Sequence, residues 1–223
     1  MTEEEWLTAK TERLAGWLGK FPERQRLLFI CACAGLVNPL FPEECPAAID
    51  YITEIADGVR LVEEIANFPC ANLSEDRHPL RTIQRAISVA RRDEDFASCE
   101  LGRAVGTVAN DHAYFRIREM PIDSDWREIR KDTQRAVKAV LWRFHLCIFN
   151  PFRPAVFDPA WRTEHTVGLA ARMYEDREFA AMPILADALE EAGCDNADVL
   201  SHCREPGPHA RGCCVVDGVL GKR

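Results

Sequence analysis

The sequence lacks the short motifs by which several common enzyme classes are recognised. It contains no Walker phosphate-binding loop, no dinucleotide-binding GxGxxG, no HExxH, no GxSxG and no CxxC pair. These absences argue against the familiar nucleotide-binding, protease and hydrolase classes. They leave other kinds of enzyme open, although a non-enzymatic role is favoured.

A long apolar run and a targeting segment are also missing. The longest apolar run, Leu27–Val37, has eleven residues, whereas a membrane-spanning helix needs about 20. This run therefore predicts a buried core helix. The N-terminal MTEEEW is acidic and has neither the basic start nor the apolar centre of a signal peptide. We expect a cytoplasmic protein with no membrane association.

The composition is that of an ordinary globular protein, with 47% hydrophobic and 29% charged residues among 223. A chain of this length buries roughly 70% of its surface on folding, so it needs no disulfides to form a core. The ten cysteines are accordingly predicted to be reduced and mostly buried, as small apolar residues. Cys31 and Cys33, within the longest apolar run, illustrate this prediction.

The net charge is −8, and it is unevenly distributed. Residues 77–147 carry 14 Lys and Arg against 10 Asp and Glu, between more acidic flanks. Nucleic-acid binding requires a concentrated basic face, so nucleic acid is not the expected partner. If it were bound, the basic face of segment 125–148 would bind it, through Arg127, Arg130, Lys131, Arg135 and Lys138.

Apolar residues recur every three or four positions, without the alternation typical of strands. We predict an all-α fold, a single compact domain over 1–223 with about nine or ten helices. The clearest helix covers 125–148 and is capped by Ser124 or Asp125. For residues 211–222 the valines leave helix and strand as alternatives.

A Pro-rich segment, NPFRPAVFDPAW, separates an N-terminal helical portion (1–149) from a C-terminal one (163–223). Proline disfavours regular helix here, and Phe152, Phe157 and Trp161 are too apolar for a free linker. We predict that 150–162 is an extended strap anchored by these aromatics.

Three helices are predicted after the strap. Thr166 is expected to cap the first, which ends near Asp176. The second begins at Pro183 with Ile184 among its inward residues. The third, ADVLSHCR, is expected to start at Asp195 or Asn196 and to end before Pro206.

The stretch HCREPGPHARGCC (202–214) concentrates potential metal ligands. We predict Cys203, His209 and Cys213 as zinc ligands, with Cys194 or His202 as the fourth, because zinc favours four Cys or His ligands in a tetrahedron. Their spacing differs from the usual C-x2–4-C knuckle. His202 and Cys203 are adjacent, so on a helix they point about 100° apart and do not easily share one ion.

Two alternatives to a metal site stay open for this stretch. Cys213 and His209 are four residues apart and could form a catalytic thiol–imidazole pair, if the imidazole reached the thiol and a third group oriented it. The other alternative is a turn, in which the Pro and Gly residues reverse the chain and Cys213 packs in the core.

Residues 183–222, PILADALEEAGCDNADVLSHCREPGPHARGCCVVDGVLGK, resemble the C-terminus of an uncharacterised, duplicated family of planctomycete-type bacterial proteins. MTEEEWL, RLLFICAC and the NPFRP and DPAW of the strap are similar to further landmarks of that family. The resemblance implies no known activity. The family often has Trp in place of Cys214 and Gly in place of Phe149. The first difference favours a packing role for Cys214.

The expected function is that of a cytoplasmic protein–protein interaction or adaptor module, whose acidic faces bind another protein. ADALEEAG also resembles a helix of a small companion domain, and this similarity suggests an interaction unit more than an enzyme. The alternative is a small zinc-binding protein with the C-terminal Cys/His site. Further alternatives are nucleic-acid binding through the 125–148 helix and a Cys/His enzyme.

Overall fold

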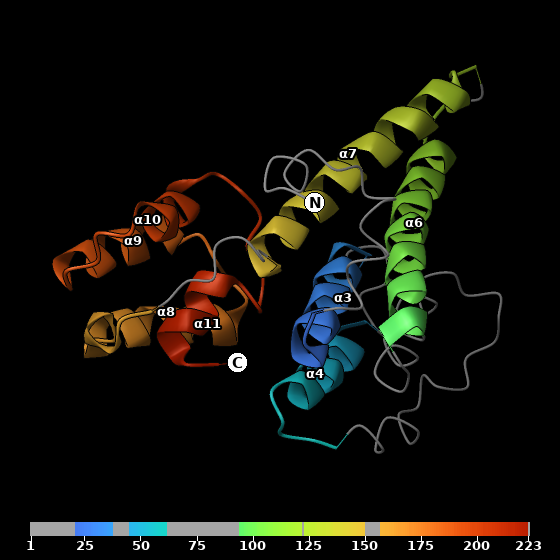
Figure 1. The fold of residues 1–223 in the computed structure, drawn as a ribbon. Coiled ribbons are helices and arrows are strands. Elements are labelled where there is room, and N and C mark those ends of the chain that lie inside the picture. Colours follow the sequence, from blue (N-terminus) through green and yellow to red (C-terminus); the bar gives the residue numbers. More distant parts are fainter. Residues whose placement is uncertain (1–20, 38–44, 62–93, 122, 150–156, 223) are drawn as a thin grey trace. The chain divides into compact units, whose positions relative to one another are not determined.

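A computed structural model describes residues 21–37, 45–61, 94–121, 123–149 and 157–222. Within these ranges the chain forms eight α-helices and one short 3-10 helix, with no strand (Figure 1). The predicted all-α fold is therefore confirmed, and the predicted total of nine or ten helices includes segments outside the described ranges. The chain divides into two compact units, Met1–Trp142 and Arg143–Arg223, which are described in turn.

The first unit contains α3 (Glu23–Val37), α4 (Cys45–Ala56), α6 (Glu94–Arg118) and most of α7 (Trp126–Ile148). Helix α3 packs against both α4 and α6, and its apolar run supplies fully buried side chains such as Leu28 and Ile30. Cys31 and Cys33 are buried as predicted. No helix in the described ranges combines the length and the apolarity that crossing a bilayer requires.

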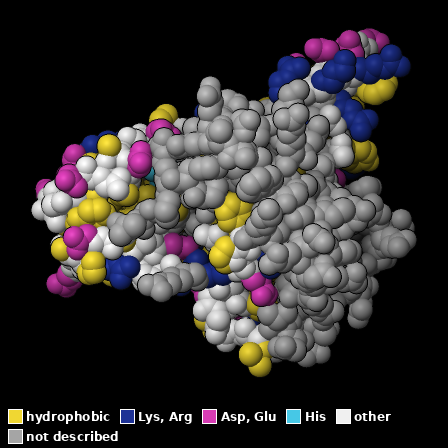
Figure 2. Space-filling view, viewed as in Figure 1, with side chains coloured by type: hydrophobic (Ala, Val, Ile, Leu, Met, Phe, Trp, Pro, Cys, Tyr) yellow, Lys and Arg dark blue, Asp and Glu magenta, His cyan; other side chains and the backbone are white. Residues whose placement is uncertain are grey.

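Helix α7 begins where the sequence predicts. The carboxylate of Asp125 accepts hydrogen bonds from the backbone N–H groups of Arg127 (3.1 Å) and Glu128 (3.3 Å), which is the action of an N-cap. The first half of the helix is largely exposed, and there Arg135 pairs with Asp132 (3.1 Å). Figure 2 shows acidic side chains among the basic ones where α6 and α7 meet. The exposed charges of this helix are therefore of both signs.

The second unit starts with the last turns of α7. The 3-10 helix η4 (Pro159–Trp161), α8 (Glu164–Asp176), α9 (Met182–Glu191), α10 (Ala197–Arg204) and α11 (Cys214–Leu220) follow. The last of these decides between the alternatives for 211–222 in favour of a helix. Gly221, with φ +69°, ends α11 in the left-handed conformation that glycine tolerates best.

The N-caps of two helices show how far local sequence determines their starts. Asn196 caps α10 as predicted, because its side-chain oxygen accepts from the N–H groups of Asp198 (3.0 Å) and Val199 (3.2 Å). For α8 the predicted cap, Thr166, is wrong. Thr163 is the cap and accepts from the N–H of Thr166 (3.2 Å). Thr166 is buried one turn later and donates to the carbonyl of Trp161 (2.7 Å).

The core of the second unit lies among α8, α9, α10 and α11. Helix α9 buries residues at helical spacing, Met182, Leu185, Ala186 and Leu189. The prediction that Ile184 points inward is wrong, since its side chain is 55% exposed. Because successive helix positions are rotated by about 100°, Ile184 falls beside the stripe that begins at Met182.

Residues 150–156 of the predicted strap, including Phe152, lie outside the described residues. Phe157 and Trp161 pack against the core of the second unit, and their rings meet edge to face with centroids 5.5 Å apart. The predicted aromatic anchoring holds for these two residues, although Pro159–Trp161 is a 3-10 turn instead of extended chain. Arg162 also donates from Nε to the carbonyl of Gly218 (3.1 Å).

Gly218 is where the end of the strap meets α11. A Cβ atom at this position would lie 2.3 Å from Cδ2 of Phe157, so Gly218→Ala must displace the ring. We expect a loss of about 1–3 kcal/mol in the free energy of unfolding, as for other overpacked sites. The control is Gly168→Ala in α8, where a Cβ meets nothing within 4 Å. That change should stabilise by about 0.5–1 kcal/mol. Equal effects in urea denaturation would contradict the contact.

Candidate metal centre

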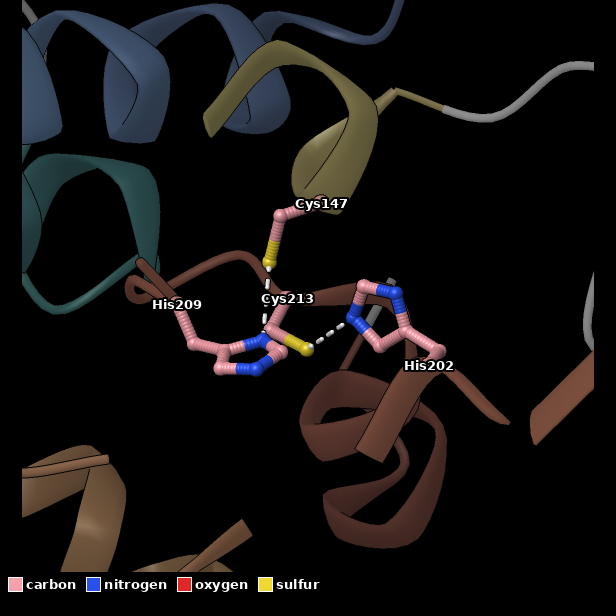
Figure 3. Close-up of side chains that lie close together, drawn as sticks. All are labelled: Cys147, His202, His209 and Cys213. Atoms are coloured by element: carbon pink, nitrogen blue, oxygen red, sulfur yellow. Dashed lines mark hydrogen bonds between the residues drawn. The ribbon is translucent and has the colours of Figure 1, made fainter. Parts of the chain in front are cut away.

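Four Cys and His side chains of the second unit point toward one another (Figure 3). They are Cys147, His202, His209 and Cys213, and their sulfur and nitrogen atoms all lie within 4.8 Å of one another. Nε2 of His202 lies 3.3 Å from Sγ of Cys213. Sγ of Cys147 lies 3.6 Å from Nδ1 of His209. Cysteine and histidine converge here as they do in zinc sites.

Helix ends and one loop position these four side chains. Cys147 is in the last turn of α7, and His202 is in the last turn of α10. His209 lies in the loop between α10 and α11, and Cys213 is the residue that immediately precedes α11. Two of the four residues, Cys147 and Cys213, also belong to the buried core of the unit.

The loop that carries His209 is held at both ends. Arg143 donates to the carbonyl of Pro206 (3.3 Å). Arg211 donates to the carbonyls of Tyr174 (2.6 Å) and Glu175 (3.0 Å), where the last carbonyls of α8 need partners.

A tight turn then delivers Cys213. Gly212 adopts φ +91°, a left-handed conformation that a side chain would strain. The N–H of Cys213 donates to the carbonyl of Ala210 (3.0 Å), which closes the turn. The turn at Gly212 thus holds the loop in a shape that brings both His209 and Cys213 into the group of four.

The observed distances match a tetrahedral zinc site. Zn–S bonds of about 2.3 Å and Zn–N bonds of about 2.0–2.1 Å give a tetrahedron whose S···N edges are about 3.6 Å and whose S···S edge is about 3.8 Å. Two of the four S···N distances here are 3.3 Å and 3.6 Å. No two of the four atoms are more than 4.8 Å apart. This upper bound is about 1 Å longer than the S···S edge of the tetrahedron, and small side-chain rotations can make up the difference.

The electrostatics of the cluster favour a thiolate at Cys213. Burial raises the pKa of this thiol, but hydrogen bonds from Cys147 and Cys214 and the nearby imidazole of His202 lower it by more, so the pKa lies well below its usual range. The same contacts raise the pKa values of its neighbours Cys147 and His202. The hydrogen bond to Cys213, and then burial, raise the pKa of Cys147. For His202 burial lowers the pKa, but the Cys213 charge raises it overall.

The catalytic pairing considered from the sequence is not the one in the structure. Cys213 approaches His202, and His209 approaches Cys147. His209 and Cys213 are also not on one helix, since both lie between the end of α10 at Arg204 and the start of α11 at Cys214. Cys213 is 0% exposed, whereas a nucleophile must meet its substrate. The site as built serves coordination better than nucleophilic attack.

The structure brings together three of the five residues that the sequence singled out, namely His202, His209 and Cys213. The sulfurs of Cys203 and Cys194 are not among the four grouped ligand atoms, although both residues are buried nearby in the same core. Burial raises the pKa of the Cys203 thiol, which suits a packed, protonated side chain. Cys147 was missed because no local pattern connects it to a stretch that begins 55 residues later.

Comparison with known proteins gives no relative, since no family model, no curated protein and no solved structure matches the chain. The resemblance to a planctomycete-type family therefore stays a prediction. The grouped Cys and His side chains of the second unit are therefore the basis for a proposed function.

Proposed function

We propose that the second unit is a zinc-binding module in which Cys147, His202, His209 and Cys213 hold one Zn²⁺ ion. The observation that carries the proposal is the convergence of two sulfur and two nitrogen atoms within 4.8 Å. Random packing of buried cysteines does not require two half-buried imidazoles to turn toward the same point.

The ligand set favours zinc over other metals. Two thiolates and two imidazoles in a tetrahedron are typical of zinc, whereas calcium and magnesium prefer oxygen ligands. We expect a cytoplasmic location, where thiols stay reduced and remain available to the metal. Zinc itself undergoes no redox change, so the site would keep its metal while its thiolates stay intact.

The proposed site is structural. Four protein ligands fill a tetrahedron, while catalytic zinc sites keep one position for water or substrate. The ligands come from the end of α7, the end of α10, the following loop and the start of α11. One ion bound to all four would fix these segments relative to one another within the second unit.

A structural metal in a small helical unit is compatible with the interaction role expected from the sequence. The observation that favours this second role is on α9, where Ile184 is 55% exposed and Asp187 and Glu191 are exposed on the same helix, although Asp187 already pairs with Arg204 (2.9 Å). An apolar side chain flanked by carboxylates suits a protein partner that carries basic and apolar residues. We propose protein binding as the role that the zinc-stabilised unit performs.

The test of zinc binding is metal analysis of the full-length protein, purified without added metal, followed by zinc-edge X-ray absorption on the same sample. We expect one zinc per chain, bound by sulfur and nitrogen. A folded protein without stoichiometric metal, which also fails to take up added zinc, would overturn the proposal.

A further inference from the structure

The sulfur of Cys213 is surrounded by other thiols of the second unit. The sulfur of Cys147 lies within 4.8 Å of it, and Cys203 and Cys214 are close enough to interact with it electrostatically. All four cysteines are free of disulfides. Two neighbouring metal-binding thiolates can together lose two electrons to an oxidant and form a disulfide.

Geometry selects Cys147 as the partner of Cys213. Their sulfur atoms belong to the group within 4.8 Å, and the two residues lie on separate segments that can adjust independently. Cys214 is the next residue in the chain, so its Cα is about 3.8 Å from that of Cys213. Disulfides usually span about 4.4–6.8 Å between Cα atoms, and a bond between these neighbours would be strained. The sulfur of Cys203 is not in the group.

We propose that hydrogen peroxide converts the zinc-bound thiolates of Cys147 and Cys213 into a disulfide and releases the ion, which makes the site a redox-controlled zinc switch. This inference rests on the proposed zinc binding. One thiolate attacks an oxygen of the peroxide and breaks the O–O bond, which gives a sulfenic acid and releases hydroxide. The second thiolate then attacks the sulfenic sulfur, forms the S–S bond and displaces the hydroxyl group as a second hydroxide. In total the two thiolates lose two electrons, the peroxide and two protons yield two waters, and Zn²⁺ leaves without a redox change.

The burial pattern allows a small oxidant and disfavours a large one. The two sulfurs are 2% and 0% exposed, whereas both imidazoles are half-buried. The imidazoles are therefore the ligands that solvent reaches. Hydrogen peroxide is hardly larger than water and can pass beside a displaced imidazole, while a protein disulfide or glutathione disulfide cannot reach the sulfurs without opening the unit.

Oxidation and metal removal then leave the unit in different states. A disulfide between residues 147 and 213 would still join the end of α7 to the start of α11, as the ion does. It would free only the two imidazoles and the loop that carries His209. The oxidised protein should therefore stay folded and become insensitive to chelators, unlike reduced protein stripped of metal.

The test uses zinc-loaded full-length protein, whose metal content is measured before any oxidant is added. Hydrogen peroxide is then titrated against a zinc-indicator dye, and disulfides are mapped by mass spectrometry. We expect one zinc released for each Cys147–Cys213 disulfide, and recovery of zinc binding after reduction. Cys214→Ser is the matched control, because it removes the neighbouring thiol and should change neither result.

Absence of zinc before oxidation counts against the proposed function itself. Zinc that stays bound while other cysteines of the chain are fully oxidised overturns the switch and leaves zinc binding intact. Release that depends on a Cys213–Cys214 disulfide, and therefore disappears in Cys214→Ser, also overturns it.

Discussion

Replacing Cys147 by serine should abolish stoichiometric zinc binding, whereas replacing Cys203 by serine should leave it intact. Cys147 supplies one of the four ligand atoms, and the sulfur of Cys203 supplies none. Changing an outer residue that only supports a ligand typically weakens binding 10–100-fold, so losing a thiolate ligand should cost more than about 100-fold. Metal analysis of the purified variants, with zinc competition against a chelating dye, measures the difference.

This pair of variants separates coordination from packing. Cys147 and Cys203 are both buried, at 2% and 0% exposure, in the same hydrophobic core. A general effect of placing a hydroxyl in that core would appear in both variants. If Cys203→Ser lost zinc and Cys147→Ser kept it, the ligand set predicted from the sequence would be right and the one proposed from the structure wrong.

Chelation of zinc should strongly destabilise the second unit and leave the first unchanged. A ligand present at about 1,000 times its dissociation constant stabilises the folded state by about 4 kcal/mol. For a unit of this size that corresponds to a fall in Tm of about 15–30 °C when the metal is removed. Circular dichroism melting of the reduced protein, with and without chelator, measures the shift.

Hydrogen exchange locates the effect. Protection should fall in α8 to α11 and stay unchanged in α3 and α4, which carry no ligand of the site. The Cys147→Ser variant is the control, since its melting should no longer respond to the chelator. Equal Tm values for the wild-type protein with and without chelator would show that the unit does not depend on metal.

Most of the helices could be predicted from the sequence because their signals are local. Asp125 and Asn196 each cap a helix through hydrogen bonds to N–H groups two and three residues ahead, and such spacing is visible in the chain. Thr163 and Thr166 show the limit. Both can cap a helix, and only the burial of Thr166 against Trp161 decides which one does.

The candidate site was predictable only in part, for a related reason. His209 and Cys213 lie in one short stretch. Adjacency on a helix indicated that His202 and Cys203 would not easily share one ion, and only His202 belongs to the group of four. Which of the two faces the site depends on how α10 is rotated in the core, and that is a tertiary property. Cys147 carries no local signal, because 62 residues separate it from its neighbour His209.

In our proposal, two cysteines and two histidines of the second unit bind one zinc ion. X-ray absorption at the zinc edge of the wild-type protein is the decisive measurement, because it counts the ligands by element and distance. We predict a first shell of two sulfurs at about 2.3 Å and two nitrogens at about 2.0–2.1 Å. A shell of oxygen and nitrogen alone, or of three or four sulfurs, would contradict the assignment of Cys147, His202, His209 and Cys213.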